Sequence, residues 1–112
     1  MAFSKAPKFD NLSYAQSIWS KATSHPARIK ILEHLAVHGI TPFRTLSRKI
    51  PLHYTTVSFH LKKLRDQGLV TAIEMYPTTY YMLEPQTCRY LLRKTKIFQS
   101  HLIKAAVQYS DQ

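Results

Sequence analysis

The sequence predicts a mainly α-helical fold with a small β-hairpin, a winged helix-turn-helix with the element order α-α-α-α-β-β-α. Two observations place its central helix. In residues 55–70, TTVSFHLKKLRDQGLV, the apolar residues Val57, Leu61 and Leu64 recur at i, i+4 and i+7, so one face of a helix is expected to be buried. Gly68 is expected to end this helix, because glycine readily adopts the left-handed conformation found just past a helix C-terminus.

The third observation is a β-rich segment directly after that glycine. Residues 69–75 and 80–83 are rich in β-branched and aromatic side chains, and they flank the stretch Tyr-Pro-Thr-Thr at 76–79. This arrangement predicts a β-hairpin. The expected turn contains no Lys or Arg, so it offers no cation of its own to a polyanion.

Prolines mark the remaining helix boundaries, since proline is tolerated in the first turn of a helix and disfavoured in its interior. Helix starts are predicted at Ser24–Pro26 and at Thr41–Pro42, each with a small hydroxyl side chain near the cap. Pro51 separates a short helix, residues 42–49, from the helix with the apolar stripe. Two helices joined by a turn at about 50–53 are what a helix-turn-helix requires.

Two further helices are expected at the ends of a single winged-helix DNA-binding domain over residues 9–112, at about 9–22 and 86–109. Residues 1–8 read as a flexible tail. The end helices carry more apolar surface than a small core obviously covers, so they are predicted to form a homodimer, although folding back onto their own core explains part of the pattern. The candidate dimer residues are Leu12, Ile18, Trp19, Leu91, Phe98, Leu102 and Tyr109.

Charge narrows the choice of function. The 112 residues contain 16 Lys and Arg against 6 Asp and Glu, a formal net charge of +10 that favours a polyanionic partner. No long apolar run is present, so we expect a cytoplasmic protein without a membrane partner, and a single cysteine, Cys88, fits a reducing compartment. Only two glycines, no phosphate-binding loop and no evident pair of catalytic carboxylates argue against an enzyme.

Two segments together carry a resemblance to a known family. HPARIKILEHL at 25–35 and TTVSFHLKKLRDQGLV, in that order, resemble the ArsR/SmtB-type (arsenic-repressor) family over roughly residues 20–83. The resemblance implies a homodimeric transcriptional repressor that releases its operator when an inducer binds, with two recognition helices in successive major grooves. By position it implies base contacts from Thr55, Thr56, Ser58 and Phe59, and it implies that His60, Lys62, Lys63 and Arg65 contact phosphate or brace the helix.

The expected DNA complex also follows from charge and symmetry. Phosphate contacts from cations supply much of the affinity by releasing counterions, and a twofold dimer presents its two helices about 34 Å apart. An imperfect palindrome with half-sites one helical turn apart is therefore the predicted operator. The candidate phosphate-contacting side chains on the two helices of the motif are Arg44, Arg48, Lys49, Lys62 and Lys63.

No cofactor is predicted, and the inducer is not identified by the sequence. His34 and His38 have the i, i+4 spacing that can hold a metal on a helix, but no third ligand is evident. Cys88 could act as a redox switch only across a dimer, and a packing role is commoner. Two other functions stay open: constitutive or architectural DNA binding, and a winged-helix protein–protein interaction module.

Overall fold

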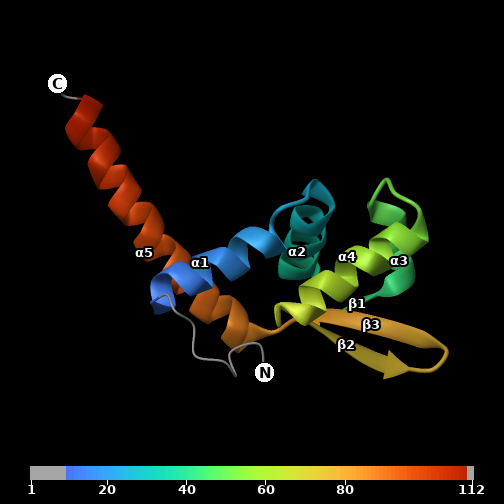
Figure 1. The fold of residues 1–112 in the computed structure, drawn as a ribbon. Helices are drawn as coiled ribbons and strands as arrows, with labels where there is room; N and C mark the ends of the chain where they lie inside the picture. The colour runs from blue at the N-terminus through green and yellow to red at the C-terminus, as the bar shows by residue number, and fades with distance from the viewer. Residues whose placement is uncertain (1–9, 111–112) are drawn as a thin grey trace.

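The computed structural model describes residues 10–110, so the segment expected as a tail lies outside the described residues. The predicted element order is confirmed, with one additional short strand (Figure 1). The elements are α1 (Asn11–Ala22), α2 (Pro26–His38), β1 (Thr41–Pro42), α3 (Phe43–Lys49), α4 (Tyr54–Asp66), β2 (Val70–Met75), β3 (Thr78–Leu83) and α5 (Pro85–Ser110).

The additional strand β1 corrects the predicted helix start at Thr41–Pro42. These two residues pair antiparallel with Tyr81 and Tyr80 of β3 and complete a three-stranded sheet of order β1-β3-β2. Proline is compatible with this position because β1 is an edge strand, and the extended backbone of Pro42 leads directly into α3 at Phe43. The Thr41 hydroxyl, expected at a helix cap, donates instead to the Gly39 carbonyl at 2.8 Å.

The start of α2 differs in a smaller way. Pro26 does occupy the first turn, but the capping side chain is that of His25, whose Nδ1 accepts a hydrogen bond from the Ala27 N–H at 3.0 Å. The hydroxyl of Ser24 donates to the Lys21 carbonyl at 2.8 Å and so satisfies the C-terminal end of α1 instead.

The hairpin turn is shorter than predicted. Thr78 and Thr79, expected in the turn, belong to β3, and the ladder extends to the pair Met75–Thr78, so only Tyr76 and Pro77 connect the strands. Of the tyrosines in this region, Tyr81 packs into the core, whereas Tyr76 at the tip is almost fully exposed.

The core forms where α4 packs against α2, α3 and the base of the hairpin. Val57, Leu61 and Leu64 are buried, as the helical spacing predicted, and Gly68 has the expected positive φ of 78° after the helix end. Leucine and isoleucine side chains from the other elements complete the contacts, among them Ile31, Leu35, Leu46 and Leu69. The inner face of α4 is thus fixed within one chain.

The two end helices pack against each other, and this corrects two of the candidate dimer residues. Ile18 of α1 and Leu91 of α5 are only 8% and 1% exposed, because they belong to the core of their own chain. Ile18 and Leu91 therefore fold back onto the core of their own chain, which is the alternative to dimer contacts given above. Leu12, Trp19 and Phe98 are partly buried.

The C-terminal half of α5 differs from its beginning. It extends away from the rest of the molecule, and Leu102 and Tyr109 are 55% and 68% exposed (Figure 1). Neither α5, with its 26 residues, nor any other helix among residues 10–110 combines the length and the apolar character needed to cross a lipid bilayer.

Candidate nucleic-acid interface

The turn between α3 and α4 positions the start of α4. Residues 50–53 connect the helices, and His53 caps α4 by accepting a hydrogen bond at Nδ1 from the Thr55 N–H at 3.3 Å. The Thr55 hydroxyl lies 2.8 Å from the same nitrogen. The oxygen lone pairs of Thr55 and its methyl group remain available to a ligand.

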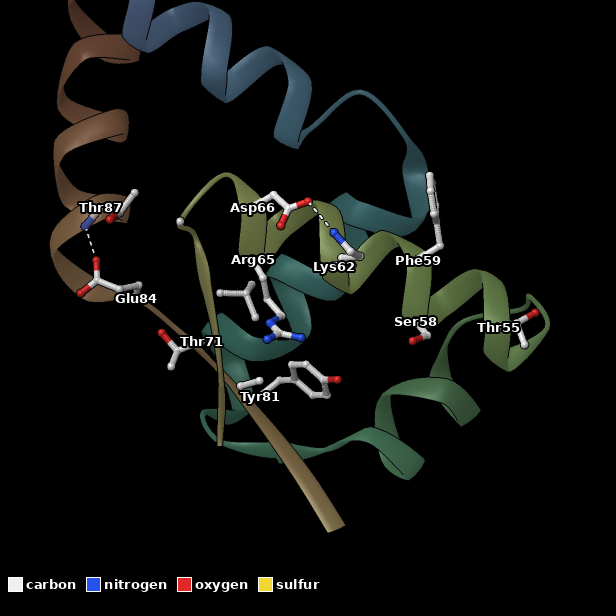
Figure 2. Close-up of a pocket in the computed structure, with 13 residues that line it drawn as sticks. Thr55, Ser58, Phe59, Lys62, Arg65, Asp66, Thr71, Tyr81, Glu84 and Thr87 are labelled. Carbon is white, nitrogen blue, oxygen red and sulfur yellow. Dashed lines mark hydrogen bonds and ion pairs between the residues drawn. The ribbon is translucent and has the colours of Figure 1, made fainter. Parts of the chain in front are cut away.

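The outer face of α4 carries the side chains predicted to contact bases. Thr55, Ser58 and Phe59 are exposed, while Thr56 is partly buried on the flank. Figure 2 shows Thr55, Ser58 and Phe59 on α4, around the groove between this helix and the sheet. The helix thus presents short hydroxyls and one aromatic ring on a rigid support, a set of groups suited to the edges of base pairs.

Two lysines of α4 are engaged with neighbours on their own helix. Lys62 forms an exposed ion pair with Asp66, with 3.1 Å between Nζ and Oδ2. The ammonium of Lys63 lies 5.2 Å from the centroid of the Phe59 ring, a cation–π contact. An exposed i, i+4 ion pair contributes at most about 0.5 kcal/mol, so phosphate can readily replace Asp66 as the partner of Lys62.

His60 is not available for phosphate, which corrects its assignment. Its side chain is only 5% exposed, and Nδ1 accepts a hydrogen bond from Nε of Arg28 at 3.1 Å. The ring also packs against His25, with 4.3 Å between the centroids. Burial, together with the nearby charges of His25 and Arg28, lowers the pKa of His60, so this residue braces α4 in its neutral form.

The Arg28–His60 contact is the part of the region that the sequence reasoning missed. Arg28 also donates through Nη1 to the Lys21 carbonyl at 2.8 Å, so one guanidinium connects the end of α1 with α4. Both residues lie in the segments that carried the family resemblance. A further signal was the spacing of His60, three residues after Val57 and four before Leu64, which places it at the edge of the buried face.

Arg65 lies on the opposite side of α4 from His60. Figure 2 shows its guanidinium directed from the helix toward Tyr81, into a groove of about 900 Å³ between α4 and the base of the hairpin. Two acidic residues, Asp66 and Glu84, also line this groove. The pKa of Glu84 is lowered mainly by the hydrogen bond from the Thr87 N–H, so its carboxylate stays ionised and disfavours phosphate at this end.

A second groove, of about 530 Å³, separates the start of α4 from the β2–β3 hairpin, which is the wing of the winged helix. Arg44 of α3, Thr55 and Ser58 of α4, and Thr78 and Thr79 of β3 are among its lining residues. The wing tip contains no cation of its own, but Arg44 brings a guanidinium to this side. Arg48 and Lys49 of α3 are also exposed. The predicted phosphate-contacting cations of α3 are therefore accessible, although their contacts with DNA stay predictions.

The candidate metal and redox residues form no obvious centre in the described part of the chain. The rings of His34 and His38 lie 4.4 Å apart, and burial is the main cause of a lowered pKa at His34. Residues 10–110 bring no third His, Cys, Asp or Glu to them. Cys88 is partly buried, its Sγ lies 3.7 Å from the Leu69 carbonyl, and burial raises the pKa of its thiol.

Comparison with known proteins agrees with this geometry. Residues 23–72 match the model of a helix-turn-helix domain family. None of the curated proteins compared with the chain matches it. Among solved structures, the chain is similar to NolR from Sinorhizobium fredii, with 28% identity and a TM-score of 0.59 over 77% of this chain and 86% of that one.

Two further structures share the fold. One is a possible transcriptional regulator for arsenical resistance, with 24% identity and a TM-score of 0.66 over 88% of this chain and 95% of the other. The second is an ArsR-like transcriptional regulator from a Rhodococcus species, with 16% identity and a TM-score of 0.68 over 91% and 95%.

The fold, the exposed face of α4 and the match over residues 23–72 define a class of protein, those with a winged helix-turn-helix domain of the kind found in DNA-binding transcriptional regulators. More particularly, its fold is similar to that of ArsR-type winged helix-turn-helix regulators, in agreement with the resemblance of residues 20–83.

Proposed function

We propose that two copies of the chain form a homodimeric repressor that binds an imperfectly palindromic operator through its two α4 helices. Bases are contacted by Thr55, Thr56, Ser58 and Phe59. Because His60 is buried, the phosphate-contacting set is reduced to the six exposed or partly exposed cations of α3 and α4, which are Arg44, Arg48, Lys49, Lys62, Lys63 and Arg65.

The observation that carries the proposal is the contrast between the two faces of α4. The inner face is fixed by the buried residues Val57, Leu61 and Leu64, while hydroxyl, aromatic and cationic side chains on the outer face are open to solvent. Specificity requires side chains that reach base edges in a fixed orientation, and affinity requires cations close to phosphates. A helix with both properties, following a short turn, suits the major groove.

Dimerisation is supported by the exposed apolar residues near the end of α5, where Leu102, Ile103 and Val107 are each more than half exposed. A second copy would remove them from water and would place two α4 helices about one helical turn of DNA apart. Repression rather than activation rests on the resemblance to arsenic-repressor proteins, and so does release by an inducer. A cytoplasmic location, with access to operator DNA, belongs to the same proposal.

Charge reversal on α4 tests DNA binding. Lys62→Glu/Lys63→Glu should abolish the salt-dependent gel shift, because each lost phosphate contact removes about 0.9 from the log-log salt slope and the new carboxylates repel the duplex. Lys96→Glu/Lys104→Glu makes the same change of charge on α5, outside the helix-turn-helix, and should retain most of the binding. Equal binding by both double variants would refute the assignment of α4, provided that circular dichroism shows both to be folded.

Selection of bound sites from a random duplex pool separates the remaining functions. A palindromic consensus would support the repressor model. Binding without a consensus would indicate an architectural protein, and no binding at low salt would leave a protein–protein interaction module.

A further inference from the structure

Phe59 is an unusual residue for the outer face of α4. It is 50% exposed, and it lies between the hydroxyl-bearing residues of this face and Lys63. Single exposed apolar side chains are common on protein surfaces, so exposure alone says little. The position of Phe59 matters because every other side chain proposed to contact bases here carries a hydroxyl group.

The ring is held from two sides. Lys63 lies over it at 5.2 Å, and the ring of His60 meets it edge-on, with 5.6 Å between the centroids and an interplanar angle of 71°. His60 is itself fixed by the hydrogen bond from Arg28. A side chain oriented in this way before binding loses little conformational entropy when it meets a ligand. Phe59 is therefore an ordered apolar group on a surface that is otherwise polar.

The major groove offers few partners for such a group. Purines and cytosine present hydrogen-bond donors and acceptors, whereas thymine also presents the C5-methyl group, the one apolar group in this groove. A phenyl ring placed against an amino or carbonyl group would remove water without replacing its hydrogen bond, which is unfavourable. Contact with a methyl group carries no such penalty.

We infer that Phe59 is a specificity-determining residue that recognises the 5-methyl group of a thymine in each half-site. This inference rests on the proposed function, since it requires α4 to lie in the major groove. Thr55 lies one turn earlier on the helix. Its side-chain methyl group and hydroxyl extend the surface beside Phe59, and this surface would accept the edge of an adjacent base.

Uracil substitution tests this contact, because deoxyuridine differs from thymidine only by the missing methyl group. The consensus duplex selected from the random pool is prepared with each thymine replaced in turn by deoxyuridine. For the wild-type protein, one substitution in each half-site should weaken binding about fourfold, the value of one buried methyl group, and the other substitutions should have little effect. Phe59→Ala should lose this sensitivity at the same position only.

Two further variants separate recognition from a general loss of packing. Phe59→Leu keeps an apolar contact and should retain a preference for thymine over uracil. Phe59→Gln can form paired hydrogen bonds with adenine and should change the selected base at that position. All three variants alter a half-exposed side chain, and circular dichroism verifies their folding.

The outcomes distinguish the two proposals. Equal wild-type affinity for the thymine and uracil forms at every position would overturn the inference about Phe59 while leaving the DNA-binding function intact. A uracil effect that persists unchanged in Phe59→Ala would overturn it as well. No selected consensus at all would overturn the proposed function itself, and the inference with it.

Discussion

Helix α4 and the C-terminal half of α5 are both amphipathic, yet only α4 has its apolar face covered by its own chain. Leu61 and Leu64 are buried in the core of the chain, whereas Leu102 and Ile103 are more than half exposed. The helix-turn-helix is therefore a complete unit within one chain. The end of α5 leaves its apolar side chains exposed, and only the proposed homodimer would cover them.

The strongest test of this contrast is a pair of matched truncations. Leu64→Ala should lower the free energy of unfolding by about 3 kcal/mol, because it removes a fully buried side chain and leaves a cavity. Leu102→Ala should change it by less than about 0.5 kcal/mol at protein concentrations where the chain is monomeric. Urea unfolding of the two variants measures both values. Similar losses in both would mean that α5 packs within its own chain over its whole length.

The second test addresses assembly. Leu102→Glu should raise the dissociation constant of the dimer by about 30-fold, which corresponds to about 2 kcal/mol, because a carboxylate would be buried at an apolar contact. Lys104→Glu introduces the same carboxylate two residues further along α5, at an exposed position, and serves as the control. Sedimentation velocity reports the change. A wild-type protein that stays monomeric at high concentration would contradict the proposed interface.

The third test uses the buried histidine that braces α4. Burial, His25 and Arg28 lower the pKa of His60 below its ordinary value of 6.5, so the unfolded chain binds a proton first as the pH falls. The stability is therefore full above about pH 6.5 and decreases below it, until the pH reaches the pKa of the folded state.

Unfolding midpoints at about pH 7.5 and 5.5 measure this decrease, and His60→Asn should reduce it. His34 also has a lowered pKa, so His34→Asn, which leaves the contact with Arg28 intact, is the matched control. If His60→Asn shows the same dependence on pH as the wild type, the pKa of His60 is not lowered in the folded protein.

The smallest expected effect concerns the ion pair on the outer face of α4. Asp66→Asn should raise the affinity for non-specific duplex about two- to threefold, because Lys62 would no longer share its charge with a carboxylate. Stability should change by less than about 0.5 kcal/mol, since the pair is exposed. Asp66→Glu keeps the pairing possible and is the control, and fluorescence anisotropy at several salt concentrations gives both affinities. Unchanged binding by Asp66→Asn would show that Lys62 does not contact phosphate.

Several elements could be predicted because their signals are local. The buried positions Val57, Leu61 and Leu64 follow from helical spacing, and Gly68 follows from the backbone conformation needed after the helix end. The strand β1 could not be predicted in this way, because two residues ending in a proline carry no strand pattern of their own. Pairing with β3, some 40 residues away, is what makes them a strand.

The sequence by itself determined the order of helices and hairpin, the exposed face of α4 and the positive charge, since each depends on the spacing of side chains along one element or on composition. Only the tertiary structure decided that His60 is buried against Arg28, that Ile18 and Leu91 belong to the core, and that Arg44 reaches the groove beside the wing. These features depend on how elements distant in sequence pack together, and the periodicity within a single element carries no information about its neighbours.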